Sequence, residues 1–241
     1  MAATGPQVPV PTEDHHRDVQ GGAARAAVFG VSDGLVSNLG LLLGVAGADP
    51  APGIVRLAGL AGLISGAISM GAGEFNSMKV QGELFERELE MERTELRRNP
   101  EYELEELSEL YESRGMPPEE ARGVARSLMR DPDLALQTHA REELGIDPGA
   151  LGSPPAAALS SFVAFSVGAV IPLVPWFFGS GTAAQVATVV LAVVAAVAVG
   201  AAVGRLADRP LPRTITRQLL FTLVPAAITF GIGNLVGVGV S

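Results

Sequence analysis

Residues 24–48 read ARAAVFGVSDGLVSNLGLLLGVAGA. A helix of about 20 apolar residues crosses the hydrocarbon core of a bilayer, so this stretch is long enough to be a membrane span. It contains one carboxylate, Asp33, with Ser32, Ser37 and Asn38 nearby. Acidic residues inside spans usually face a bundle interior or a wet cavity and serve ion or proton pathways. The pattern indicates a helix that handles a cation; the alternative is a buried helix of a soluble protein with Asp33 as a cap.

The composition of the chain favours a membrane protein. Of its 241 residues, 48% are hydrophobic and 18% are charged, and the mean hydropathy of +0.33 is above that of ordinary soluble domains. There is no Cys, which excludes thiolate metal sites and Cys nucleophiles. The sequence has no Ser-His-Asp set, P-loop or dinucleotide fingerprint, so we expect neither an enzyme nor a prosthetic group.

Five apolar segments predict an all-α fold, a five-span transmembrane helical bundle. Pairs of small residues four apart let helices approach closely in lipid, so we expect the first two spans to pack tightly, with each other or across a dimer axis. Trp176 should lie at the membrane interface. The predicted spans are residues 24–48, 53–73, 156–178, 182–203 and 215–238. The small-residue pairs are Gly30/Gly34, Gly40/Gly44, Gly62/Gly66 and Gly233/Gly237.

The acidic residues are concentrated in one block. The chain has a net charge of −9, and residues 74–143 alone hold 19 acidic and 10 basic side chains, which accounts for the whole excess. Such a surface would repel nucleic acid and attract cations. Helical periodicity continues from the second span into this block without a turn signal until Asn99-Pro100. We therefore expect the second span to leave the membrane as one long rod, followed by helices over residues 101–114, 118–130 and 132–144.

These signals divide the chain into four parts. Residues 1–22 are expected to be a flexible tail, since no apolar h-region of a signal peptide precedes the first span; its His15 and His16 are more typical of a solvated pair than of metal ligands. Residues 23–79 hold the first two spans, residues 80–147 an acidic helical domain, and residues 148–241 the last three spans.

The distribution of Arg predicts the orientation. Positive residues gather on the cytoplasmic side of short connections. They lie before the first span and between the fourth and fifth spans, with Arg56 as one exception; these residues are Arg17, Arg25, Arg205, Arg209, Arg213 and Arg217. The N-terminus and the acidic domain are therefore expected in the cytoplasm, and the C-terminus outside.

Two pairs of glutamates flank the Asn99-Pro100 turn. Glu92/Glu95 and Glu103/Glu106 both have i,i+3 spacing, and a helical hairpin would bring the pairs face to face, as in carboxylate-lined di-metal sites. His139 and Glu143, at i,i+4 on the last helix of the block, would complete the set. The alternative for any single Glu is a solvated helix face with i,i+4 ion pairs.

Met70 and Glu74 lie one helical turn apart at the end of the second apolar segment. A thioether beside a carboxylate suits a borderline transition metal. Packing by Met70 and an interfacial Glu74 is an equally good interpretation.

Together, DGLVSNLGLLLGVAGA, MGAGEF, REELG and AFSVGAVIPLVP resemble the vacuolar iron transporter family, which includes the yeast Ca2+-sensitive cross-complementer type and bacterial members. The resemblance implies a homodimer that exports Fe2+, and often Mn2+, from the cytosol in exchange for protons. It implies a path lined by Asp33, Met70 and Glu74. It also implies a metal-binding domain whose glutamates correspond to Glu92, Glu95, Glu103, Glu106 and Glu143.

The chain departs from plant members at one point. Where they have two methionines, it has His139 and Ala140; His is a borderline ligand, which adds Co2+ and Zn2+ to the candidate ions, and Ala supplies no ligand. A bacterial-type chain would lie in the plasma membrane. Two other functions stay open: a membrane-anchored, ferritin-like iron oxidase or iron store, and a carrier of an unrelated solute.

Overall fold

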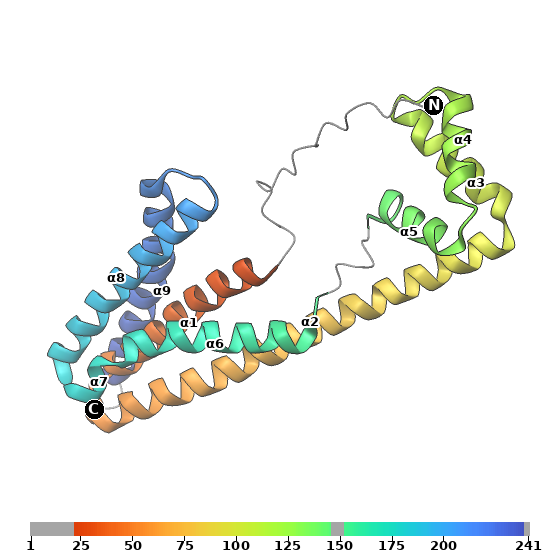
Figure 1. Ribbon diagram of the computed structural model, residues 1–241. Helices are drawn as coiled ribbons and strands as arrows, with labels where there is room; N and C mark the ends of the chain where they lie inside the picture. The colour runs from red at the N-terminus through yellow and green to blue at the C-terminus, as the bar shows by residue number, and fades with distance from the viewer. Residues whose placement is uncertain (1–21, 146–151, 239–241) are drawn as a thin grey trace, which may run out of the picture.

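The computed structural model describes residues 22–145 and 152–238, and within them it is helical with no strand (Figure 1). The predicted tail with His15 and His16 lies outside the described residues, apart from Gly22. The all-α expectation is confirmed. The helices are α1 (Gly22–Gly47), α2 (Pro52–Arg98), α3 (Pro100–Ser113), α4 (Pro118–Leu128), α5 (Pro132–Glu142), α6 (Pro154–Leu173), α7 (Pro175–Phe178), α8 (Gly181–Leu206) and α9 (Leu211–Val238).

Proline marks where many of these helices begin. Its fixed φ suits the first helical turn, where its missing N–H needs no partner. Helices α2 to α7 each have Pro at this position: Pro52, Pro100, Pro118, Pro132, Pro154 and Pro175.

Five helices, α1, α2, α6, α8 and α9, are long and apolar enough to cross a membrane, as expected. The third predicted span is interrupted: α6 ends at Leu173 and the short α7 begins at Pro175. This turn carries Trp176 inward, where it is 3% exposed and packs with Leu42 and Leu173. Trp176, expected at the membrane interface, is thus covered by protein and not exposed on the outer surface of the bundle; its depth in the membrane stays a prediction.

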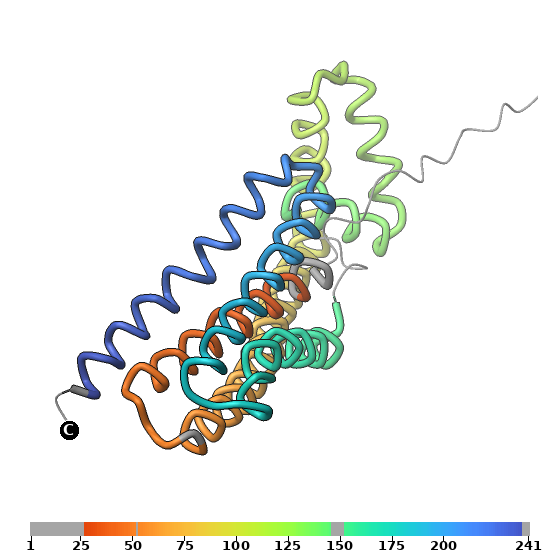
Figure 2. Tube along the Cα trace, turned by 90° about the vertical axis from the view of Figure 1, so that its left-hand side faces the viewer, coloured from red at the N-terminus to blue at the C-terminus, as the bar shows by residue number. Residues whose placement is uncertain are grey.

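Helix α2 is much longer than a membrane is thick. Its 47 residues correspond to about 70 Å at 1.5 Å per residue, against a hydrocarbon core of about 30 Å. Only its apolar first half, residues 53–73, is needed to span. The second half projects beyond the bundle and carries α3, α4 and α5 at its far end (Figures 1 and 2). The predicted long rod is thus present.

Glycines hold α1 against α6 and α9. A Cβ atom at Gly34 would lie 2.1 Å from the Phe165 carbonyl oxygen, and one at Gly168 would lie 2.0 Å from the Val31 carbonyl oxygen. Likewise, a Cβ atom at Gly233 would lie 1.8 Å from the Gly44 carbonyl oxygen. The small-residue faces were expected to pack the first two spans with each other or across a dimer axis. Within the described chain, the glycines of α1 pack mostly against α6 and α9, and packing across a dimer axis stays a prediction.

Candidate metal centre and transport path

The helices beyond the membrane bundle are fixed by small apolar contacts and local caps. Leu107 of α3, Ala121 of α4 and Ala140 of α5 are fully buried. The Asp131 carboxylate caps α5 by accepting hydrogen bonds from the Asp133 and Leu134 backbone N–H groups at 2.9 and 3.3 Å. Helix α5 packs along α2, so residues of its inner face meet residues of the α2 rod.

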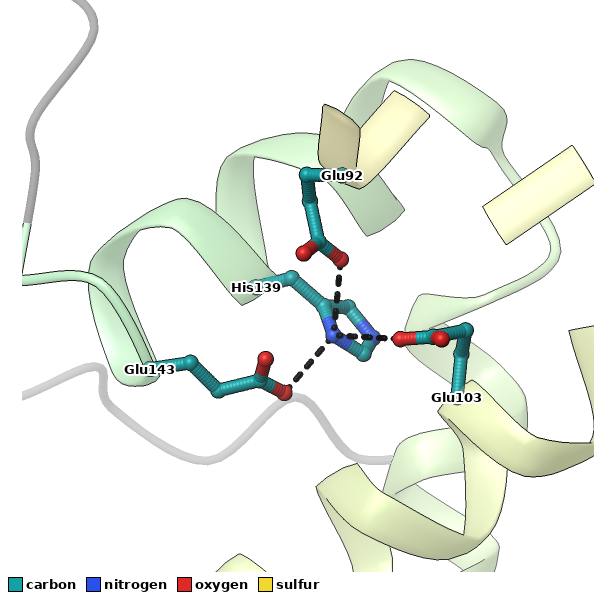
Figure 3. Close-up of side chains that lie close together, drawn as sticks. All are labelled: Glu92, Glu103, His139 and Glu143. Carbon is teal, nitrogen blue, oxygen red and sulfur yellow. Dashed lines mark ion pairs between the residues drawn. The ribbon is translucent and has the colours of Figure 1, made fainter. Parts of the chain in front are cut away.

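Three glutamates converge on one histidine in this packing (Figure 3). The His139 Nδ1 atom lies 3.2 Å from a carboxylate oxygen of Glu92, 3.7 Å from one of Glu103 and 2.7 Å from one of Glu143. One ligand atom from each of the four side chains lies within 4.8 Å of every other. We call these residues the His139 cluster.

The cluster is buried. His139 is 0% exposed, Glu92 5% and Glu103 3%. Both His139 ring nitrogens and one oxygen each of Glu92 and Glu143 have no well-aligned hydrogen-bond partner within the described residues, although the atoms lie close together. Buried polar atoms are nearly always satisfied, so these call for an additional partner such as a cation.

The buried carboxylates of the cluster, Glu92 and Glu103, lie close to one another, and burial together with this crowding shifts their pKa values. Burial, followed by the nearby Glu143, Glu103 and Glu95 carboxylates, raises the pKa of Glu92 from 4.5 to about 7, although His139 opposes the shift. Burial likewise raises the pKa of Glu103. Burial alone would lower the pKa of His139, but Glu143, Glu92 and Glu103 outweigh it and raise the pKa. A divalent cation would relieve this crowding.

Two predicted ligands lie outside the cluster. Glu95 and Glu106 are exposed, although both carboxylates are near enough to raise the pKa of Glu103. The structure therefore brings together four of the six predicted metal-domain residues, Glu92, Glu103, His139 and Glu143. Glu95 and Glu106 are placed at its edge, where they add negative charge.

The donor set of the cluster is three carboxylates and one imidazole. Oxygen ligands suit Mn2+ and Fe2+, imidazole suits Fe, Zn and Cu, and thiolates are absent, so the cluster fits borderline divalent ions. Ala140 is fully buried and contributes no ligand. The arrangement of these four side chains could hold a divalent metal ion.

A second candidate site lies within the spanning helices. A hollow of about 330 Å³ between α1 and α2, reached also by Phe165 of α6, is lined by residues that include Asp33, Asn38 and Met70. Asp33 and Met70 are half-buried. The Ser37 hydroxyl, also at the hollow, donates to the Asp33 backbone carbonyl and lies 3.4 Å from the Asp33 carboxylate.

The hollow brings together two of the three predicted path residues. Glu74, one turn beyond Met70 on α2, is half-buried but is not among the residues that line it. Sequence reasoning missed Phe165, since nothing in the order of the spans indicates that α6 closes this hollow. The apolar sequence around Phe165 predicts a membrane span but not which hollow the side chain lines.

Comparisons with known proteins agree with this architecture. A family model described as the VIT family matches residues 24–234. The chain belongs to the VIT family. It is 40% identical over 186 residues to the vacuolar iron transporter of Acanthamoeba castellanii, covering 74% of this chain and 67% of that protein.

Plant members of the VIT family are similar over the same extent. Vacuolar iron transporter 1 of Eucalyptus grandis is 34% identical over 185 residues, with 74% of this chain and 73% of that protein covered. The Arabidopsis thaliana protein of that name gives the same figures. The resemblance to vacuolar iron transporters is confirmed, and relatives named as transporters agree with a chain that is not an enzyme. With five apolar helices, this VIT family member is an integral membrane protein.

Proposed function

We propose that this chain exports Fe2+, and also Mn2+, from the cytosol in exchange for protons. The observation that carries the proposal is the hollow in which Asp33 and Met70 meet inside the apolar helices. A buried metal cluster alone would suit storage as well as transport. An acid and a thioether facing one hollow within the spans suit the passage of a borderline cation.

The His139 cluster would capture the ion before transport. The acidic domain would attract cations from the cytosol, and the cluster offers buried ligand atoms that have no well-aligned hydrogen-bond partner within the described residues. Glu95 and Glu106 at its edge would steer ions inward and are proposed as further ligands during transfer. From there the ion would pass to Glu74, Met70 and Asp33.

Proton coupling follows from the need for a deprotonated ligand. Metal binding requires the Asp33 carboxylate in its charged form, so a proton arriving from the far side would displace the ion. The same carboxylate would then release its proton toward the cytosol. Metal and protons would therefore move in opposite directions.

The orientation is proposed from the arginines. Exposed arginines surround the connection between α8 and α9, which lies at the end of the bundle from which the α2 rod projects (Figures 1 and 2): Arg205 in the last turn of α8, Arg209 in the connection, and Arg213 and Arg217 at the start of α9. The positive-inside rule places this end in the cytoplasm and the C-terminus outside. For a bacterial-type member this membrane would be the plasma membrane.

The transporting unit is proposed to be a homodimer. The hollow is flanked by exposed apolar side chains, among them Phe29 at 62% and Leu41 at 39% exposed. A second copy packed on α1 and α2 would cover these side chains and enclose the path, as the family resemblance implies.

The competing function is an anchored iron oxidase or iron store. The buried His139 cluster is compatible with this function, because one carboxylate-rich site would serve iron oxidation or storage as well as metal capture for transport. However, the Glu-x-x-His pairs of di-iron bundles are missing, since the only His residues are His15, His16 and His139.

Purified protein in sealed vesicles separates the two. Transport predicts uptake of Fe2+ and Mn2+ with opposite movement of protons, read by metal- and pH-sensitive dyes. Oxygen consumption on addition of Fe2+ without any flux would contradict transport and favour the oxidase.

A further inference from the structure

Asn38 is held in one orientation inside the helix bundle. It is 1% exposed on α1, and its side-chain Nδ2 donates a 2.7 Å hydrogen bond to the Ala169 carbonyl oxygen of α6. A carbonyl can only accept, so the amide nitrogen must face α6. The Oδ1 atom is thereby fixed on the other branch of the amide.

That Oδ1 atom is buried without a hydrogen-bond partner among the described residues. A buried acceptor left unsatisfied destabilises the fold, so its retention needs a reason. Asn38 lines the same hollow as Asp33 and Met70. Gly62 of α2 lies directly beside this oxygen: a Cβ atom there would lie 2.8 Å from Oδ1 and 2.4 Å from the Leu41 Cδ2 atom, so the glycine keeps a side chain away from Oδ1.

We propose that the Asn38 Oδ1 atom is a metal ligand in the transport path, binding the divalent cation together with the Asp33 carboxylate and the Met70 thioether. This inference rests on the proposed transport function and adds a ligand to it. An amide oxygen is a suitable ligand for Mn2+ and Fe2+. It adds a ligand without adding charge, so the site binds the ion weakly enough to release it.

The other role open to Asn38 is to join α1 to α6 through its amide nitrogen. Substitution by Leu or Asp removes that donation in both cases, but only Asp keeps an oxygen at the position. The two variants therefore separate a ligand from a structural contact.

The test measures initial Mn2+ uptake into vesicles against Mn2+ concentration. We expect Asn38→Leu to raise KM for Mn2+ about tenfold or more, the usual loss when a group that supports a metal site is removed. Asn38→Asp should keep KM at or below the wild-type value and lower the maximal rate, because the added charge slows release of the ion.

Thr222→Val is the matched control. Thr222 is fully buried on α9, and among the described residues its hydroxyl has no hydrogen-bond partner, as is the case for Asn38 Oδ1, but Thr222 does not line the hollow. It should keep the wild-type KM. Gly62→Ala is a second variant, which leaves both partners of the Asn38–Ala169 hydrogen bond in place and crowds Oδ1. Gly62→Ala should also raise KM. Its control is Gly73→Ala, whose added Cβ is unhindered.

Unchanged KM in Asn38→Leu, or an equal rise in the Leu and Asp variants, would overturn the inference. If Asn38→Leu fails to fold, an unchanged KM in Gly62→Ala overturns it instead. Failure of the proposed function gives a different result, since the wild-type protein would then move no divalent cation at all.

Discussion

The His139 imidazole and the Glu92 carboxylate come from different helices and lie 3.2 Å apart, both buried. This contact places the end of α5 on the α2 rod and makes a single site from residues on both sides of the Asn99-Pro100 turn.

His139 is predicted to be the ligand whose loss weakens metal binding most selectively. His139→Ala should lower the affinity of the purified protein for Zn2+ and Co2+ more than for Mn2+, since imidazole is preferred by the later ions. Titration calorimetry with each ion measures this. An equal loss for all ions would contradict a direct bond from the imidazole.

Burial divides the predicted glutamate ligands into two classes. Glu103→Gln should reduce metal affinity about 10- to 100-fold, because it removes a buried carboxylate of the cluster. Glu95→Gln and Glu106→Gln, at exposed positions, should cost less than about tenfold and mainly through lost attraction, which salt reduces. Titrations at low and high salt check this, and equal, salt-independent losses at all three positions would contradict it.

The metal-free cluster should become less stable as pH rises. Between pH 4.5 and about 7 the unfolded chain has released the Glu92 proton while the folded chain keeps it, so raising the pH favours unfolding. The raised pKa of His139 acts in the same direction, because its charged form stabilises the fold until pH passes that pKa. The Glu92 effect is at most about 3 kcal/mol, at about 1.4 kcal/mol per pKa unit.

Hydrogen exchange of α5 backbone amides measures this stability. Protection should fall from pH 5 to pH 8, after correction for intrinsic exchange, and return when Mn2+ is added at pH 8. Glu92→Gln is the control and should weaken the pH dependence, because it removes the contribution of the Glu92 carboxylate. Protection that rises with pH in the metal-free protein would contradict the predicted shifts.

The crossing of α1 and α6 depends on glycine. Gly168→Ala should destabilise the folded protein by about 1–3 kcal/mol or more, because its Cβ atom would overlap the Val31 carbonyl group. In Gly73→Ala, no described residue apart from the chain neighbours and the nearby backbone of α2 lies within 4 Å of the added Cβ, so this variant should be neutral or stabilising. Thermal unfolding in detergent compares the two, and equal stability would contradict the packing.

Much of the fold could be predicted because its signals are local. Apolar length predicts each span, and Pro100 and Pro132 mark where helices begin. The interruption at Pro175 and the burial of Trp176 could not be predicted, since they depend on how α7 packs against the rest of the bundle. For the same reason, the sequence predicts glycine faces that allow close packing, but it does not predict that the glycines of α1 contact α6 and α9.

The candidate site was predictable in its residue types and less so in its grouping. The i,i+3 spacing placed Glu92 and Glu95 near each other. Which face of α2 packs against α5 decides that Glu92 is buried and Glu95 is exposed. Asn38 looked like one polar residue among several. Its importance becomes visible only through its hydrogen bond to Ala169, far away in sequence.

The role of Asp33 in coupling metal to protons is tested most directly by metal-driven proton flux in vesicles containing Asp33→Ala protein. Thr222→Val, which changes a buried residue that does not line the hollow, is the control. Asp33→Ala should stay folded and dimeric but lose the proton flux driven by Fe2+ or Mn2+ by at least about tenfold, while Thr222→Val keeps most of it. Full metal-driven proton flux in folded Asp33→Ala protein would contradict the proposed mechanism.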